Sequence, residues 1–231
     1  MVDKSHIEML LRLHFANFME EIPLVPEDYE IDDLGQVSTH IGVYMKRKTK
    51  DRRLPVKFRE VVGDFSVSGC ELVSLEGCPS FLTGDFWCEG NNLTTLEHAP
   101  PTSVNISCSN NKLANLLHCP GNTDELQCDG NLLKSLETCP PTKFLYAINN
   151  PFEHFRNTPS HIDEIVVTAY PNLPLLALLT VKKINLIDPD TGKQMEELSN
   201  IMNRYAGQGK AGAFDCRREM RASGYESNAQ W

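Results

Sequence analysis

One pattern of apolar and polar positions returns five times along the middle of the chain. Each copy starts with two apolar or small positions two residues apart and ends with two positions, mostly Leu, three residues apart. Between them stands a Gly or Asn followed, in four copies, by Asn. The copies occupy residues 65–75, 86–96, 106–116, 126–136 and 145–155. Such regular recurrence predicts a repeat array.

Each column of this pattern has a physical role. Apolar positions two apart share one face of a short strand, so we expect the strand to bury them. The Gly or Asn suits a turn with positive φ, and the Asn that follows can satisfy buried backbone groups that the strand leaves unpaired. Because one coil cannot bury its own apolar face, the coils must stack and share a core.

The pattern resembles the leucine-rich repeat in its short bacterial form of about 20 residues per coil. We therefore expect an α/β fold, a short leucine-rich-repeat solenoid with one parallel sheet, an N-terminal capping helix and a C-terminal helical cap. The expected organisation is a capping helix and a degenerate first coil over 1–62, the solenoid over 63–157, and a C-terminal strand with the helical cap over 158–231.

The N-terminal flank has the periodicity of an amphipathic helix over residues 5–22. We expect it to cover the open end of the solenoid rather than to bind a partner. Its apolar stripe consists of Ile7, Leu10, Leu11, Phe15, Phe18, Met19 and Ile22. Residues 24–62 then form an extended lead-in and the degenerate coil, with Val43 and Met45 at its strand positions.

The C-terminal flank predicts three elements. Residues 184–186 are typical of a last strand. Apolar residues at helical spacing predict a helix over about 191–206, which Gly207 ends, and a second over about 210–222.

Composition narrows the class of protein. Of 231 residues, 41% are hydrophobic and 23% charged, which is ordinary for a globular protein, and the net charge is −9. That charge repels nucleic acid and leaves room for basic partners. No export signal is visible and no apolar run is long enough to span a bilayer, so we expect a cytosolic protein with no membrane contact.

The eight cysteines fall mainly into two columns of the repeat. Both columns interchange Cys with Val or Ala, which predicts small buried packing groups. Their members are Cys88, Cys108 and Cys128 in one column and Cys78, Cys119 and Cys139 in the other. A thiolate metal site is the weaker alternative, because no Cys-x-x-Cys pair occurs; we expect neither a metal nor a cofactor. Cys70 stands in the Asn column, and Cys216 lies alone on the last helix, where no recognised motif activates it.

Strand residues that alternate with the core positions should line the concave face of the solenoid. This face is acidic and carries aromatic residues, which is typical of interface anchors with steering charges. The partner-binding candidates are Asp85, Trp87, Glu89, Glu125, Gln127, Asp129, Phe144 and Tyr146. The alternative is that Trp87 packs on its neighbours and the acids only confer solubility.

A basic stretch interrupts the degenerate coil. Six of the eight residues at 46–53 are basic, namely Lys46, Arg47, Lys48, Lys50, Arg52 and Arg53. We favour a solvated loop, since no aromatic residue interleaves the charges. The alternative is an anion or nucleic-acid contact, supported by Arg217, Arg218 and Arg221 on the last helix.

Three local features resemble a family of uncharacterised leucine-rich-repeat proteins carried by tailed bacteriophages. They are residues 54–58 with 61–65, the motifs at 74–79 and 84–86, and the tail segments 205–213 and 222–231. The resemblance covers nearly the whole chain and implies a non-structural phage product in the bacterial host cytoplasm, without implying an activity. The sequence departs from the family at 46–53, where an apolar Leu would normally stand.

Together these features predict a phage-encoded protein-binding module that binds and modulates, and most simply inhibits, a bacterial host protein such as a defence or takeover target. We expect no enzymatic activity, because paired carboxylates, a Ser/His/Asp set, a phosphate loop and a metal motif are all missing. The bacterial effector ubiquitin ligases have similar repeats, but Cys216 is followed by Arg217 and Arg218, unlike their Cys-x-Asp nucleophile motif. A nucleic-acid or nucleoprotein-binding accessory protein that acts through 46–53 is the main alternative, and a virion or assembly role is another.

Overall fold

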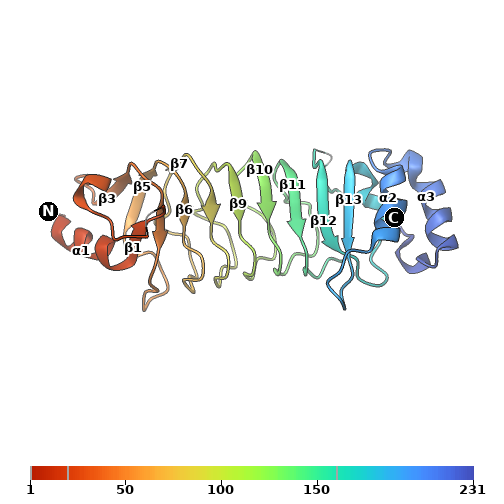
Figure 1. The fold of residues 1–231 in the computed structure, drawn as a ribbon, viewed down its shortest axis with the longest axis horizontal. Helices are drawn as coiled ribbons and strands as arrows, with labels where there is room; N and C mark the ends of the chain where they lie inside the picture. Colours follow the sequence, from red (N-terminus) through yellow and green to blue (C-terminus); the bar gives the residue numbers. More distant parts are fainter. Residues whose placement is uncertain (1, 20, 160) are drawn as a thin grey trace. The chain divides into compact units, whose positions relative to one another are not determined.

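The computed structural model describes residues 2–19, 21–159 and 161–231, and the chain divides into two compact units. Unit 1 runs through residue 113 and includes Leu117–Thr123; unit 2 comprises Ala114–Leu116 and Asp124–Trp231. Each unit is an α/β solenoid in which every coil contributes one short strand to a common sheet (Figure 1). The predicted α/β solenoid is confirmed.

The main sheet of unit 1 stacks the predicted strand positions in register. Its parallel strands are β4 (Val43–Met45), β6 (Phe65–Ser66), β8 (Phe86–Trp87) and β9 (Asn105–Ser107). Val43 lies opposite Phe65, Phe65 opposite Phe86, and Phe86 opposite Ile106. All four are buried, so the repeat alignment and the strand of the degenerate coil are both confirmed.

The predicted helix over 5–22 is wrong beyond residue 14. Helix α1 spans Lys4–His14 and is capped by the Asp3 carboxylate, which accepts a hydrogen bond from the His6 N–H. The chain then forms strand β1 (Phe15–Asn17), antiparallel to β4. This pairing satisfies the backbone groups of β4, which would otherwise form an open sheet edge. Met19 and Ile22, assigned to the buried stripe, are exposed.

The prediction of one parallel sheet is also wrong for unit 1. A second sheet contains β2 (Tyr29–Ile31), β3 (Gln36–Thr39), β5 (Lys57–Val61) and β7 (Phe81–Leu82), with the 3-10 turn η1 (Pro26–Asp28) before it. β2 and β3 are antiparallel, and β3, β5 and β7 are parallel. Phe58 of β5 packs edge-on against Phe15 and Phe65, with ring centroids 5.0 and 5.1 Å away. The second sheet of unit 1 therefore packs on the same hydrophobic core as the main sheet.

Unit 2 continues the same strand pattern past the predicted repeats. It contains β10 (Thr123–Gln127, all but its first residue), β11 (Thr142–Ala147), β12 (Glu164–Thr168) and β13 (Lys183–Ile187). Leu145 lies opposite Ile165, and Ile165 opposite Ile184. The strand expected at 184–186 is confirmed, whereas β12 was not predicted.

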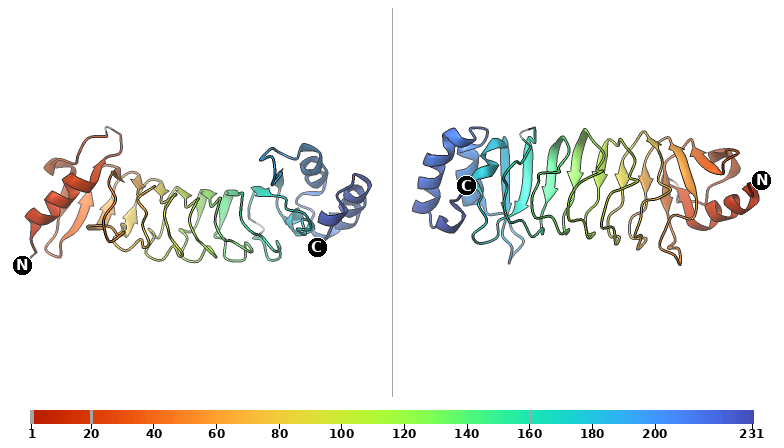
Figure 2. Two further views of the ribbon diagram at one scale, coloured as in Figure 1. Left: turned by 90° about the horizontal axis from the view of Figure 1, so that it is seen from below. Right: turned by 180° about the vertical axis from the view of Figure 1, so that it is seen from behind.

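Helices follow the strands of unit 2. The 3-10 helix η2 (Leu176–Thr180) precedes β13, and α2 (Glu196–Tyr205), α3 (Lys210–Ala222) and η3 (Glu226–Asn228) come after it. Figure 2 shows α2 and α3, in blue, next to β13 at the end of the strand stack of this unit. The helix expected at 210–222 is confirmed, and the one expected at 191–206 begins later, at Glu196.

The turn that follows each repeat strand has the conformation that its residues predict. Gly90 has φ +66°, and Asn110, in the same column of the next coil, has φ +56°. Asn tolerates this left-handed region better than other residues with a side chain. The alternation of Gly and Asn at this position therefore follows from the backbone.

The next column is a ladder of buried asparagines. The Asn91 side chain accepts the Leu72 N–H at 2.9 Å and donates to the carbonyls of Val67 and Cys88, both at 2.9 Å. Its bonds therefore join its own coil to the preceding one. Asn111 and Asn150 repeat this arrangement in their own units, with the N–H of Leu93 and Leu133 respectively. The predicted role of the Asn column is confirmed.

Candidate functional site

Residues that alternate with the core positions of the main strands form what we call the outer face of each unit. On the outer face of unit 1, Trp87 of β8 stacks on Phe18, with ring centroids 5.0 Å apart and 15° between the planes. Phe18 in turn meets the edge of Tyr44 at 6.3 Å. We call these three residues the aromatic cluster. Phe18, predicted for a buried helical stripe, reaches this face because the helix ends early and its N–H donates to the Gly42 carbonyl.

Carboxylates beside the aromatic cluster are held by the next coil. The Asp85 carboxylate accepts hydrogen bonds from the backbone and side-chain N–H groups of Asn105, both at 3.0 Å. Glu89 accepts the Ser107 hydroxyl at 2.5 Å. The predicted site residues Asp85, Trp87 and Glu89 therefore lie together, with the negative charges fixed in position.

The outer face of unit 2 begins with three predicted polar residues. The Gln127 side-chain amide donates to the Glu125 carboxylate at 2.5 Å. The Asp129 carboxylate accepts the Ile148 N–H at 2.6 Å. Burial raises the pKa of Asp129, and this hydrogen bond opposes the rise. Asp129 is therefore held within the turn that follows β10, rather than presented freely to solvent.

Two aromatic residues of β11 complete the predicted set on unit 2. Phe144 is 40% exposed, an unusual position for a phenylalanine in the middle of a sheet. It lies opposite Glu164 of β12. Tyr146, two residues on, is half-buried and lies opposite Val166. Together they give this face an apolar centre bordered by carboxylates.

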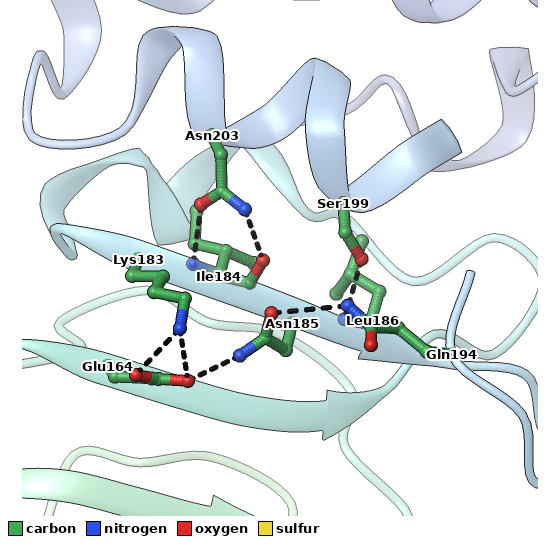
Figure 3. A network of polar contacts seen from close by, with 8 residues as sticks. All are labelled: Glu164, Lys183, Ile184, Asn185, Leu186, Gln194, Ser199 and Asn203. Atoms are coloured by element: carbon green, nitrogen blue, oxygen red, sulfur yellow. Dashed lines mark hydrogen bonds and ion pairs between the residues drawn. The ribbon is translucent and has the colours of Figure 1, made fainter. Parts of the chain in front are cut away.

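Sequence reasoning missed the polar network beside Phe144. Glu164 accepts two hydrogen bonds from the Lys183 ammonium, at 3.0 and 3.1 Å, and one from the Asn185 amide at 2.5 Å (Figure 3). Asn185 also accepts a hydrogen bond from the Gln194 amide at 3.4 Å. The signal for these positions was the strand spacing, which carries on from Leu145 to Ile165 although the Asn column has ended.

Helix α2 fixes β13 from the other side, as Figure 3 also shows. The Asn203 side chain accepts the Ile184 N–H at 2.7 Å and donates to the Ile184 carbonyl at 2.8 Å. The buried Ser199 hydroxyl accepts the Leu186 N–H at 3.0 Å. These bonds satisfy backbone groups of β13, the last strand in the order of the described sheet. The outer face at Lys183 and Asn185 is consequently rigid.

The basic stretch 46–53 is partly neutralised by the coil that follows it. The Lys48 ammonium lies 2.7 Å from the Glu71 carboxylate, and Arg53 lies 3.3 Å from Glu76. The Arg52 guanidinium donates to the Glu71 carbonyl at 3.0 Å. Three of the six cations are therefore used to hold the loop.

The other three cations of this stretch differ among themselves. Arg47 and Lys50 are exposed, whereas Lys46 is half-buried, and its burial lowers the pKa of the ammonium. None of the described residues forms an ion pair with these three side chains. They are not joined by an aromatic side chain of the same loop, so the arrangement lacks a surface on which bases could stack.

The cysteine columns are packing groups. Cys88, Cys108 and Cys128 are fully buried, and Cys119 is half-buried. Burial raises the pKa of Cys88, and raises that of Cys139 to about 12. Such thiols are poor nucleophiles at neutral pH. Across the described ranges, His, Cys, Asp and Glu form no group of three or more placed to hold a metal ion.

Within residues 2–19, 21–159 and 161–231, every helix falls short of the length and apolar character needed to cross a bilayer. Comparisons with protein-family models, with curated proteins and with solved structures find no match for this chain.

Proposed function

We propose that this protein is a non-enzymatic binding module that captures another protein through the outer faces of its strands. The observation that carries the proposal is Phe144, which is 40% exposed on β11 and opposite Glu164. When a partner covers an exposed aromatic ring, apolar surface is removed from water and the complex is stabilised. Aromatic residues are also enriched among the residues that contribute most to binding at interfaces.

The charges around the aromatic residues indicate the chemistry of the partner. Glu125 lies on the outer face of unit 2, and Asp85 and Glu89 lie on that of unit 1. Because hydrogen bonds hold these carboxylates in place, little conformational entropy is lost when they meet a cation. The proposed partner therefore presents apolar side chains among lysines or arginines.

The finer parts of the proposal rest on the sequence. We propose that the coils are leucine-rich repeats and that α1 at one end and α2 with α3 at the other act as caps. We further propose a phage-encoded protein that acts in the bacterial cytoplasm and inhibits a host protein by covering its surface. Inhibition of this kind needs no catalytic residue, which agrees with the buried, unreactive thiols.

A nucleic-acid partner is less well supported. Glu71 and Glu76 neutralise Lys48 and Arg53, and the outer faces carry carboxylates that would repel phosphates.

The proposal is tested by capture from a bacterial lysate with the tagged chain and matched variants. Phe144→Ala and Trp87→Ala each remove an aromatic side chain from an outer face. Phe81→Ala is the control, because Phe81 is also an exposed strand phenylalanine, 52% exposed, but lies on β7 of the second sheet. We expect the captured protein, identified by mass spectrometry, to be lost with at least one outer-face variant and kept with the control.

Two results would contradict this function. One is capture that survives both outer-face substitutions in a correctly folded protein. The other is capture that depends on nucleic acid, so that nuclease treatment of the lysate abolishes it.

A further inference from the structure

A groove in unit 2, lined by none of its outer-face residues, combines aromatic side chains with cations. It consists of two pockets of about 310 and 410 Å³ that share Lys210 and Trp231 in their walls. Volumes of this size are typical of sites that hold a small ligand or a few side chains. We call it the aromatic–cationic groove and define it by Leu176, Phe214, Trp231, Arg156, Lys210 and Arg217.

The fold builds the groove from elements that are fixed elsewhere. Helix α3 buries Gly212, Cys216 and Met220 and leaves Phe214 and Arg217 on its other side. The chain after η3 is tied to η2, because the Leu176 N–H donates to the Gln230 carbonyl at 3.0 Å. Trp231, the residue after Gln230, is therefore held beside η2.

Hydrogen bonds from one buried side chain strengthen this attachment. The Asn228 amide donates to the carbonyls of Tyr170 and Leu173, at 2.9 and 3.0 Å. Asn228 is 6% exposed, so these bonds are shielded from water and hold the segment firmly. The wall that carries Trp231 is thus preformed.

The aromatic part of the groove is open to solvent. Phe214 is 75% exposed and Trp231 is 38% exposed. Exposed rings of this kind, close together and next to a cavity, mark interaction surfaces. A ligand that entered the groove would bury both.

The charges of the groove contrast with those of the rest of the molecule. The chain has 22 Lys and Arg against 31 Asp and Glu. Even so, no described residue forms an ion pair with Arg156, Lys210 or Arg217. The Lys210 ammonium lies 5.9 Å from the centre of the Trp231 ring, within the range of a cation–π contact.

Neighbouring cations on α3 show that the local acids are already engaged. Arg218 pairs with Asp215 at 3.0 Å, and Arg221 pairs with Glu226 at 3.6 Å. The three cations of the groove therefore remain available to an anionic partner. Because the cations surround the apolar side chains of Leu176, Phe214 and Trp231, a complementary ligand has an apolar centre and carboxylates at its edges.

The polar groups of the walls argue against a nucleotide. The Asn157 amide donates to the Glu137 carboxylate at 3.1 Å, and the hydroxyls of Thr158 and Thr180 donate to carbonyls of their own turns. One N–H of Asn157 and the hydroxyl hydrogens of Thr158 and Thr180 are therefore engaged within the protein, which leaves few side-chain donors in these walls for the edge of a base.

We propose that the aromatic–cationic groove docks a linear peptide segment of a protein partner. The segment places a Leu or Phe side chain between Phe214 and Trp231, and its flanking Asp or Glu residues pair with Arg156, Lys210 and Arg217. This site uses different elements from the outer faces, so it stands independently of the function proposed above.

The test measures fluorescence anisotropy of short fluorescein-labelled peptides with the full chain. The peptides alternate Leu or Phe with Glu or Asp in permuted orders. Two control sets replace either the acids by Gln and Asn or the apolar residues by Ser. We expect saturable binding of the first set only, weakened by added salt because ion pairs contribute.

Matched variants locate the binding. Phe214→Ala should weaken it about tenfold or more, as expected for an anchoring aromatic residue. Arg217→Gln should weaken it about two- to fivefold, the range of an exposed ion pair. Arg218→Gln, one residue away and outside the groove, should change it by less than about twofold. Circular dichroism of each variant shows whether the fold is kept.

Several outcomes would overturn the proposal. They are no binding by any acidic–apolar peptide, equal binding by a control set, or equal loss with Arg217→Gln and Arg218→Gln. Binding of AMP or ATP in place of the peptides, lost with Phe214→Ala, would assign the groove to a nucleotide instead. Trp87→Ala leaves peptide binding unchanged if the two sites are independent, which separates this test from that of the outer faces.

Discussion

The asparagine ladder allows a quantitative test of how one coil supports the coil before it. We consider Asn91→Ala. The substitution removes the acceptor for the buried Leu72 N–H and the donor for the carbonyls of Val67 and Cys88. Asn91 is only 6% exposed, so bulk water cannot replace these contacts.

The expected loss of stability follows from the Leu72 N–H and the Val67 carbonyl, because the Cys88 carbonyl keeps the Asn111 amide as a donor at 3.0 Å. A buried polar group left without a partner costs about 1–3 kcal/mol. A water molecule in the vacated space can hydrogen-bond to some of these backbone groups. We therefore expect the free energy of unfolding to fall by about 2–5 kcal/mol rather than by the full sum. With a urea m-value of about 2–3 kcal/mol per M, the midpoint of unfolding should fall by about 1–2 M.

The assay uses the two tryptophans of the chain, one in each unit. In a Trp231→Phe background the emission reports on Trp87, which shares unit 1 with Asn91. Asn92→Ala is the matched control, because Asn92 is the neighbouring, half-buried asparagine. We expect the control to shift the midpoint by less than about 0.5 M, since substitutions without lost buried partners cost little. Equal shifts for the two variants would refute the reasoning.

Cys70 occupies the ladder position of the first of the five repeats, and its thiol lies 3.4 Å from the Met45 carbonyl of the preceding coil. Cys70→Asn should keep or raise the urea midpoint, and a loss as large as that of Asn91→Ala would contradict the role of the column. Cys119 is half-buried while the other thiols are buried, so Ellman's reagent should label about one thiol quickly in the native protein at pH 8; Cys119→Ser should abolish this phase, and its persistence would exclude the assignment. Burial raises the pKa of Asp129, so the folded state binds this proton more tightly than the unfolded state, whose Asp pKa is about 3.9. The protonated Asp129 therefore makes its full contribution to the free energy of unfolding below a pH of about 3.9, and this contribution is lost as the pH rises through the raised pKa of the folded state. Relative to Asp129→Asn, the unmodified chain should lose stability as the pH rises from about 4 toward 7, and a difference in urea midpoint that did not vary with pH would count against it.

The strands and turns of the repeats could be predicted because local backbone geometry or burial determines which residues suit each column. Gly and Asn are favoured at a turn residue with positive φ, as at Gly90 and Asn110, and an amide side chain can satisfy the buried backbone groups of the turn. Strand β12 was missed because the coil that contains it lacks the Asn and the first Leu of the repeat pattern. Tyr170 and Asn172 replace the Asn and the first Leu of the pattern, and only Ile165, Val167 and Leu175 keep its spacing.

Parts of the candidate site depended on pairing that a sequence does not reveal. The apolar spacing of residues 5–22 fits a helix, yet the open edge of β4 draws the chain into β1 and turns Phe18 toward Trp87. In the same way, Lys48 is neutralised by Glu71 because the next coil places the two side chains together. Local propensity cannot anticipate either contact, since both arise between segments that are distant in sequence.

The direction of the asparagine ladder has a consequence for synthesis on the ribosome. Asn91 serves Leu72, and Asn111 serves Leu93, so a later coil always completes an earlier one. The newest coil of an emerging chain is thus never finished until its successor appears. At about 5–20 residues per second, a coil of about 20 residues needs about 1–4 s. Each coil is therefore exposed for that interval, and a ribosome that pauses between two coils would prolong the exposure of the last one made.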